Sequence, residues 1–137
     1  MGMGEIENEL KLSIELSPYD ALAYNWYANY LYATSRFDEA YTMANMAIKY
    51  SDDPGYKIGL GAMSYFSQDF ERLKKEMLDL ISYYPNYAPA YDWLGMAYIQ
   101  LQEFDNSIEA YEKATSLSGG LAEILGGLGH AYGMAGN

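Results

Sequence analysis

Apolar residues recur along this chain with the period of an α-helix rather than with the alternation of a β-strand. One stripe at helical spacing contains Tyr91, Leu94, Gly95, Tyr98 and Leu101. A second stripe follows after a short polar break and contains Phe104, Ile108, Tyr111, Ala114 and Leu117. Each stripe covers one face of a helix, so this region predicts a helix, a short turn and a second helix.

This helix–turn–helix unit repeats about every 34 residues. A small residue recurs at four positions, spaced by 33, 34 and 34 residues: Ala28, Gly61, Gly95 and Gly129. A phenylalanine recurs at three positions, spaced by 33 and 34 residues: Phe37, Phe70 and Phe104. Because independent landmarks share one period, the pattern indicates an array of repeats.

The repeat predicts an all-α fold of about eight helices. Six helices are expected at 21–34, 37–50, 55–67, 70–83, 88–101 and 104–117. Flanking half-repeats add helices at 5–16 and 122–134. We expect a single domain, 1–137, divided into the second helix of a partial repeat at 5–16, repeats at 21–53, 54–87 and 88–121, and the first helix of a partial repeat at 122–137.

The composition excludes several classes of function. Eight basic residues against nineteen acidic ones leave the 137-residue chain with a net charge of −11, so we expect binding neither to nucleic acid nor to anionic membranes. The chain has no cysteine, which excludes disulfides and thiolate metal sites. No apolar run approaches the roughly 18 residues of a membrane span. These features predict a cytoplasmic protein.

No residue pattern predicts catalysis, a metal site or a cofactor. His130 is the one histidine and has no serine or aspartate partner in a triad-like context, so it is expected to pack or to line a groove. The acidic residues Glu5, Glu7 and Glu9 spread over a solvated helix surface. The glycine-rich run at 126–129 follows no strand and precedes no Lys-Ser/Thr pair, so it does not match a phosphate-binding loop. The chain is therefore not expected to be an enzyme.

The chain resembles the tetratricopeptide repeat (TPR) family. Residues 88–121 match the family pattern best, through Tyr91, Leu94, Gly95, Tyr98, Ser107, Tyr111 and Ala114. Ser107 stands where alanine is usual, and Gly119 where proline is usual. Repeat 54–87 is the most degenerate, since Lys57 and Ser64 replace the large residue and the tyrosine. The resemblance implies an α-solenoid of antiparallel helix hairpins, stacked into a superhelix with a concave face, and a fragment of a larger TPR-containing protein.

The resemblance also implies a scaffold that mediates protein–protein interaction through the concave face, which the first helix of each repeat lines. The residues expected on this face are Asn25, Asn29, Tyr32, Ile58, Ala62, Tyr65, Asp92, Met96, Ile99 and His130. The amides of Asn25 and Asn29 lie one helical turn apart and are placed to hold the backbone of an extended peptide. The alternative is a structural role, in which the tyrosines and the methionine pack between adjacent repeats instead of binding a partner.

The charge of this face limits the kind of protein segment that it can bind. TPR domains of co-chaperones hold an acidic C-terminal tail with lysine and arginine on successive first helices. Here Asp92 and Met96 stand on the matching helix of the third repeat instead, so we expect a neutral, basic or apolar protein segment as the partner. The alternative function is a structural spacer or oligomerisation module. Its open repeat ends would self-associate into a homodimer through residues such as Leu125 and Leu128.

Overall fold

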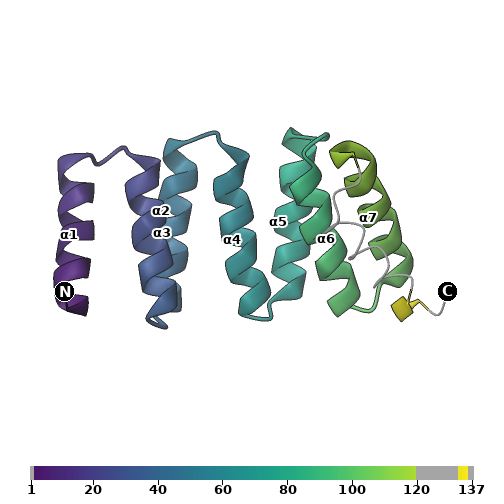
Figure 1. The fold of residues 1–137 in the computed structure, drawn as a ribbon, viewed down its shortest axis with the longest axis horizontal. Helices are drawn as coiled ribbons and strands as arrows, with labels where there is room; N and C mark the ends of the chain where they lie inside the picture. Colours follow the sequence, from purple (N-terminus) through teal and green to yellow (C-terminus); the bar gives the residue numbers. More distant parts are fainter. Residues whose placement is uncertain (1, 120–132, 136–137) are drawn as a thin grey trace. The chain divides into compact units, whose positions relative to one another are not determined.

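The computed structural model describes residues 2–119 and 133–135, and this part of the chain contains seven α-helices and no strand. The helices are α1 (Met3–Leu16), α2 (Ala21–Ala33), α3 (Phe37–Tyr50), α4 (Pro54–Phe66), α5 (Phe70–Tyr83), α6 (Ala88–Gln100) and α7 (Phe104–Ser118) (Figure 1). The six central helices begin and end within one residue of the predicted ranges. The all-α helical-repeat class is thereby confirmed. The eighth helix, predicted at 122–134, lies almost wholly outside the described residues.

Aspartates and prolines set several helix starts. The carboxylate of Asp20 accepts a hydrogen bond from the Leu22 amide at 3.0 Å, and that of Asp69 accepts one from the Arg72 amide at 3.2 Å. Both satisfy amides that have no partner inside the helix. Pro54 is the first residue of α4, where its missing amide proton costs nothing.

The three turns inside the helix hairpins share one backbone conformation. The second residue after the first helix has a positive φ in each: 64° at Ser35, 62° at Gln68 and 61° at Gln102. The amide that follows bonds back to the helix, as from Arg36 to the Leu31 carbonyl at 2.8 Å and from Glu103 to the Tyr98 carbonyl at 2.8 Å. This is the Schellman way of ending a helix, and here none of the left-handed residues is a glycine.

The chain forms two compact units, Met1–Met63 and Ser64–Asn137. In the first unit, α2 and α3 pack as an antiparallel hairpin and α1 lies against α2 (Figure 1). Their core is built from Tyr27, Ala28, Leu31, Ala40, Ala44, Leu60 and Met63. The last two residues come from α4, so α4 completes this core.

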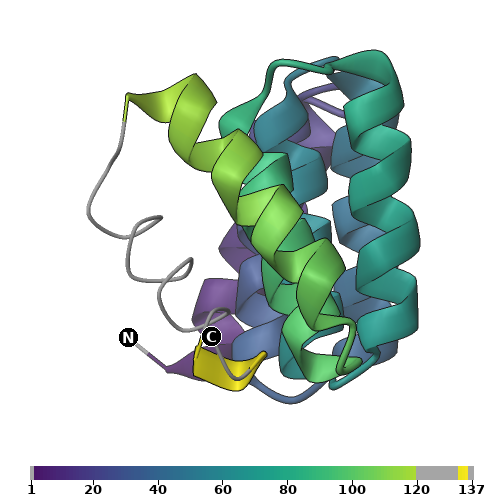
Figure 2. The same ribbon diagram turned by 90° about the vertical axis from the view of Figure 1, so that its right-hand side faces the viewer.

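In the second unit, α6 lies between α5 and α7, and α7 faces the viewer in Figure 2. The small residue of this repeat is Gly95 of α6, and its missing side chain lets α7 pack closely against α6. A Cβ atom on Gly95 would lie 2.8 Å from ring carbons of Tyr111, closer than such atoms approach. The buried hydroxyl of Ser107 donates to the Gly95 carbonyl at 2.9 Å. Ser107, which stands at the usual alanine position, therefore has a hydrogen-bond partner for its buried hydroxyl.

A hydrogen bond recurs with the repeat. The Tyr24 hydroxyl donates to the Pro18 carbonyl at 2.8 Å in the first unit. The Tyr91 hydroxyl donates to the Pro85 carbonyl at 2.7 Å in the second unit. Both pairs are offset by 67 residues, which is two periods. Residues 67 apart are therefore structural counterparts in the two units.

Candidate functional site

Four of the predicted face residues lie on α2 and α4 in the first unit. Asn25 is half-buried and Asn29 is exposed on α2, while Ile58 and Ala62 are half-buried on α4. The Asn25 Oδ1 atom lies 3.9 Å from the position that a Cβ atom on Gly59 would take, so α2 and α4 adjoin here. The result is a pair of amides beside an apolar stripe, which we name the amide face.

Tyr32 lies near the end of α2 and is half-buried. Its ring meets Phe37 edge to face, with 5.0 Å between ring centroids. Phe37 begins α3, so the two rings close one end of the α2–α3 hairpin. Part of the Tyr32 surface is therefore used for packing.

Tyr65 of the second unit lies in an aromatic cluster. Its ring lies at edge-on angles to Phe66, Phe70 and Trp93, with centroid distances of 5.3, 5.6 and 5.8 Å. Trp93 belongs to α6, so this cluster ties the end of α4 to the next first helix. Tyr65 thus has a packing role, as the structural interpretation of the tyrosines expects.

The predicted face residues of α6 differ in exposure. Asp92 and Met96 are half-buried, and Met96 packs against Ile99 and Tyr111. Ile99 is only 7 % exposed, because Tyr111 of α7 covers it, so it offers little surface to a partner. The prediction that Ile99 lies on an open face is therefore wrong. His130 lies outside the described residues.

The negative charge of Asp92 affects the pKa of Tyr111, a buried residue of the α6–α7 hairpin. Burial raises the pKa of the Tyr111 hydroxyl above its usual value of 10.0, and the negative charge of Asp92 raises that pKa further. Both effects disfavour the charged phenolate. Tyr111 is therefore neutral at pH 7 and acts as a large packing residue rather than as an acid or base.

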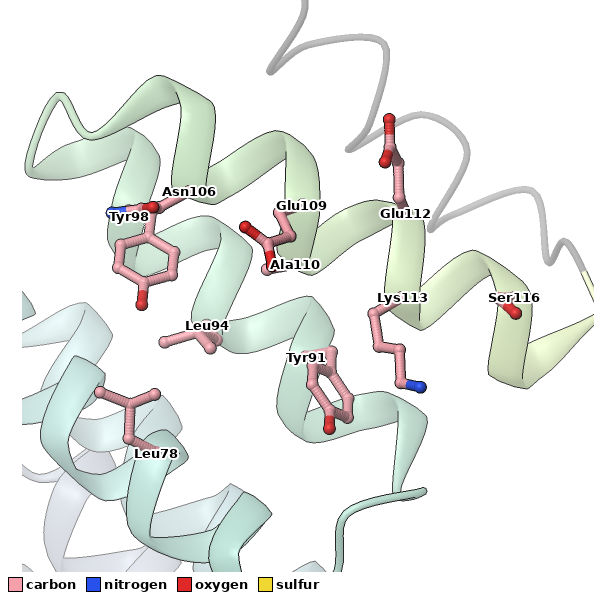
Figure 3. Close-up of a pocket in the computed structure, with 10 residues that line it drawn as sticks. All are labelled: Leu78, Tyr91, Leu94, Tyr98, Asn106, Glu109, Ala110, Glu112, Lys113 and Ser116. Carbon is pink, nitrogen blue, oxygen red and sulfur yellow. The ribbon is translucent and has the colours of Figure 1, made fainter.

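The second unit also contains a groove of about 670 Å³ that the sequence did not indicate (Figure 3). Its lining residues are Leu78 of α5, Tyr91, Leu94 and Tyr98 of α6, and Asn106, Glu109, Ala110, Glu112, Lys113 and Ser116 of α7. Figure 3 shows Leu78 across the groove from Leu94. None of the predicted face residues that the structure describes lines it. The only signal in the sequence is the polar stripe of α7 at helical spacing, which equally describes a solvated face.

The groove has no catalytic arrangement among its described side chains. The Tyr91 hydroxyl is already bonded to the Pro85 carbonyl. Burial raises the pKa of Tyr98 above its usual value of 10.0, with a further contribution from the Glu103 charge. In the part of the chain that the structure describes, no three His, Cys, Asp or Glu residues are grouped to hold a metal ion. Within the same residues, no helix has both the length and the apolar character needed to span a membrane.

The sequence of residues 88–120 matches the family model described as "Tetratricopeptide repeat". This segment covers α6 and α7 and corresponds to the repeat predicted at 88–121. None of the curated proteins compared with the chain matches it significantly.

Solved structures that resemble the chain are tetratricopeptide-repeat proteins. MamA from Desulfovibrio magneticus RS-1 superposes with a TM-score of 0.78 at 19 % identity, over 97 % of this chain and 76 % of that one. The first TPR of Spaghetti (RPAP3), bound to the HSP90 peptide SRMEEVD, gives 0.74 at 17 % identity, over 86 % and 94 %. The TPR2AB domain of yeast Sti1 in complex with pHSP90 gives 0.76 at 24 % identity, over 84 % and 47 %. At these identities the likeness establishes the fold.

Proposed function

Because this chain is a tetratricopeptide-repeat protein, we propose that it is a non-catalytic scaffold that binds a protein or peptide partner through the amide face of α2 and α4. Two of its structural neighbours, the RPAP3 and Sti1 domains, are complexes with HSP90 peptides or HSP90. We expect the protein to act in the cytoplasm, which its lack of cysteine permits.

The arrangement of the amide face carries this proposal. An extended peptide presents amide donors and carbonyl acceptors in alternation, and an asparagine side chain offers both kinds of partner. Asn25 and Asn29 stand one helical turn apart, and among the described residues neither side chain makes a hydrogen bond. Ile58 and Ala62 lie on α4, whose Gly59 adjoins Asn25, and we expect them to receive an apolar side chain of the peptide.

Charge supports a neutral or basic ligand. The counterparts of Asn25 and Asn29 in the second unit are Asp92 and Met96, which supply a negative charge and no cation. The whole chain carries −11, so an acidic segment is repelled at long range as well.

The test begins with an array of random 12-residue peptides, from which the best binder is labelled and titrated by fluorescence anisotropy. We expect the selected peptides to be neutral or basic. The double variant Asn25→Ala/Asn29→Ala should bind about 10- to 100-fold more weakly, because each lost hydrogen bond is worth roughly 0.5–1.5 kcal/mol.

Asn45→Ala is the matched control. Asn45 is also an exposed asparagine of the first unit, but it lies on α3 and donates to the Tyr41 carbonyl at 2.9 Å. Circular dichroism checks that each variant keeps its helix content. The proposal fails if Asn45→Ala weakens binding as much as the double variant does, or if the array selects acidic peptides.

A further inference from the structure

The groove of about 670 Å³ in the second unit, which we name the α5–α7 groove, joins an apolar surface to a polar one (Figure 3). Tyr91, Leu94 and Tyr98 of α6 lie between Leu78 of α5 and the lining residues of α7. Leu78 is 46 % exposed at the edge of the groove. Its volume lies in the range of protein clefts that bury a ligand, and its apolar side chains can be shielded from water by a partner.

The polar side of the α5–α7 groove is one stripe of α7. The stripe consists of Asn106, Glu109, Lys113 and Ser116. These residues recur at spacings of three and four, so they share one face of the helix. All four are exposed, and within the described residues none of their side chains makes a hydrogen bond or an ion pair. Figure 3 shows Lys113 extending toward Tyr91, whereas Glu112 extends from the other side of α7.

Glu109 and Lys113 are the two charged residues of this stripe. They stand one helical turn apart with the glutamate first, which is the arrangement that favours an ion pair along a helix. They form no ion pair with each other or with any other residue that the structure describes. Two opposite charges on one side of the groove can therefore pair with a ligand.

The first unit uses the same repeat positions differently. The counterparts of the four stripe residues are Glu39, Thr42, Met46 and Lys49 of α3. Glu39 pairs with the arginine three residues before it, and the Thr42 hydroxyl donates to a carbonyl of the preceding turn at 3.0 Å. Met46 packs against a hydrophobic cluster, and the Lys49 ammonium lies 5.3 Å from the centre of the next tyrosine ring. The repeat fold itself therefore does not require unpaired charges at these positions.

The spacing of the stripe fits a helix better than an extended peptide. Successive stripe residues are about 4.5 or 6 Å apart along the axis of α7, and the residues on one face of a second helix have the same spacing. Side chains on one face of an extended peptide recur about every 6.6 Å. A helix also pairs its own backbone groups, so it can cover the apolar residues of α6 without leaving those groups unbonded.

We propose that the α5–α7 groove binds an amphipathic helix of a different protein, which carries an acidic and a basic residue one turn apart. The basic residue faces Glu109, the acidic residue faces Lys113, and apolar side chains of the helix lie between Leu78 and Leu94. A second copy of this chain is a poor partner, because each copy carries a net charge of −11. The groove and the amide face lie on different helices, so the proposal does not depend on the peptide-binding function.

The probes are three alanine-based peptides of about 14 residues, each with leucines on one face and two charged residues one turn apart beside them. The mixed peptide carries a glutamate and a lysine, the second peptide two lysines and the third two glutamates, and a side-chain crosslink holds each one helical. In about 0.15 M salt, we expect the mixed peptide to bind the native chain about tenfold more tightly than the other two in fluorescence anisotropy. The net charge of −11 alone would favour the two-lysine peptide, so this preference reports on the charges of the groove.

Reversing one charge of the protein at a time should change the preferred peptide. Lys113→Glu should bind the two-lysine peptide most tightly, and Glu109→Lys the two-glutamate peptide. The matched control is Lys49→Glu, which makes the same change of charge at an exposed position of α3. That variant should keep the preference for the mixed peptide.

Removal of an apolar contact tests where the peptide lies. Leu78→Ala should weaken the binding of all three peptides by about three- to tenfold, because less apolar surface is buried. Leu12→Ala is the control, since Leu12 is a leucine of α1 with a similar exposure, 51 % against 46 %. It should leave the affinities unchanged.

Several outcomes would overturn the proposal: tightest binding of the two-lysine peptide by the native chain, no binding up to about 1 mM peptide, or an unchanged preference in Lys113→Glu. A mixed peptide with a central proline cannot complete the helix, so equally tight binding of that peptide would show an extended occupant instead. A dimer of the chain alone that Lys113→Glu abolishes would make a second copy the occupant.

Discussion

At the scale of single residues, facing positions of a hairpin differ from repeat to repeat as pairs, so that a change in size at one position is matched at the other. In the first unit the small residue Ala28 and its counterpart across the hairpin, Ala44, are both buried. In the second unit the corresponding pair is Gly95 and Tyr111, where the missing Cβ leaves room for the ring. The sequence identifies Gly95 as a repeat landmark, but only the structure shows that Tyr111 occupies the space.

Gly95→Ala is therefore expected to lower the free energy of unfolding by about 1–3 kcal/mol, since its Cβ atom would overlap ring carbons that are themselves buried. Gly59→Ala is the control, because its Cβ atom would meet nothing nearer than 3.9 Å. That variant should be as stable as the native chain or up to about 1 kcal/mol more stable, from the better helix propensity of alanine. Urea unfolding measures both, and equal stabilities of the two variants would refute the packing argument.

The predicted site shows the limit of reasoning residue by residue. Asn25 and Asn29 lie on α2 and Ile58 and Ala62 on α4, and their role as one binding face stays a prediction. Ile99 was placed on the same face by its position in the repeat, but Tyr111 covers it. Spacing along a helix gives the direction of a side chain, whereas its exposure depends on what the neighbouring helix carries.

At the scale of elements, helix lengths and turns follow from local sequence. Apolar periodicity and the aspartates and prolines at helix starts were sufficient to place six helices within one residue. The conformation of the turns was not predictable in the same way. Ser35, Gln68 and Gln102 all take the left-handed conformation without being glycine, so the repeat geometry imposes a conformation that these residues disfavour.

Gln102→Gly should relieve this strain and raise the free energy of unfolding by about 0.5–1 kcal/mol, after allowance for the greater freedom of glycine in the unfolded chain. The control is Gln100→Gly, two residues earlier at the exposed end of α6, where φ is helical. There glycine should cost up to about 1 kcal/mol. If thermal or urea unfolding shows Gln102→Gly to be the less stable variant, the turn is not strained.

At the scale of the whole molecule, a net charge of −11 is distributed over two compact units. In the first unit, Glu7 of α1 accepts a hydrogen bond from the Tyr27 hydroxyl at 3.0 Å and forms an ion pair with Arg36, which precedes α3. One carboxylate thus links α1 to both helices of the next hairpin. In the second unit, Lys74 of α5 bonds Glu103, which precedes α7, at 3.2 Å.

The hydrogen bond from Arg36 holds the pKa of Glu7 below its ordinary value of 4.5, with burial opposing this shift. A lowered pKa in the folded state means that the Glu7 interactions stabilise the protein above pH 4.5 and are lost as the pH falls through the folded-state pKa. The native chain should therefore lose stability between about pH 5 and pH 3 more steeply than Glu7→Gln.

Glu15→Gln is the control for net charge, because it removes the same charge from an exposed position on the same helix. Its free energy of unfolding should fall as steeply with decreasing pH as that of the native chain. Urea midpoints measured across this pH range compare the three proteins. A parallel pH dependence of the native chain and Glu7→Gln would show that Glu7 contributes nothing specific.

Self-association through the repeat ends stays a prediction, since Leu125 and Leu128 lie outside the described residues. Light scattering over a concentration series tests it, because the mass of a self-associating chain rises with concentration.

The sequence by itself determined the all-α class, the 34-residue period and the helix boundaries, because all three depend on local propensity and on spacing along one helix. It also predicted that Asn25 and Asn29 share one face of a helix, since one helical turn separates them. Tertiary structure decided which surfaces are open. Ile99 falls on the expected open face by its position in α6, yet it is only 7 % exposed and packs against Tyr111 of α7. Its burial depends on a side chain of another helix, and the pattern along α6 carries no information about that side chain.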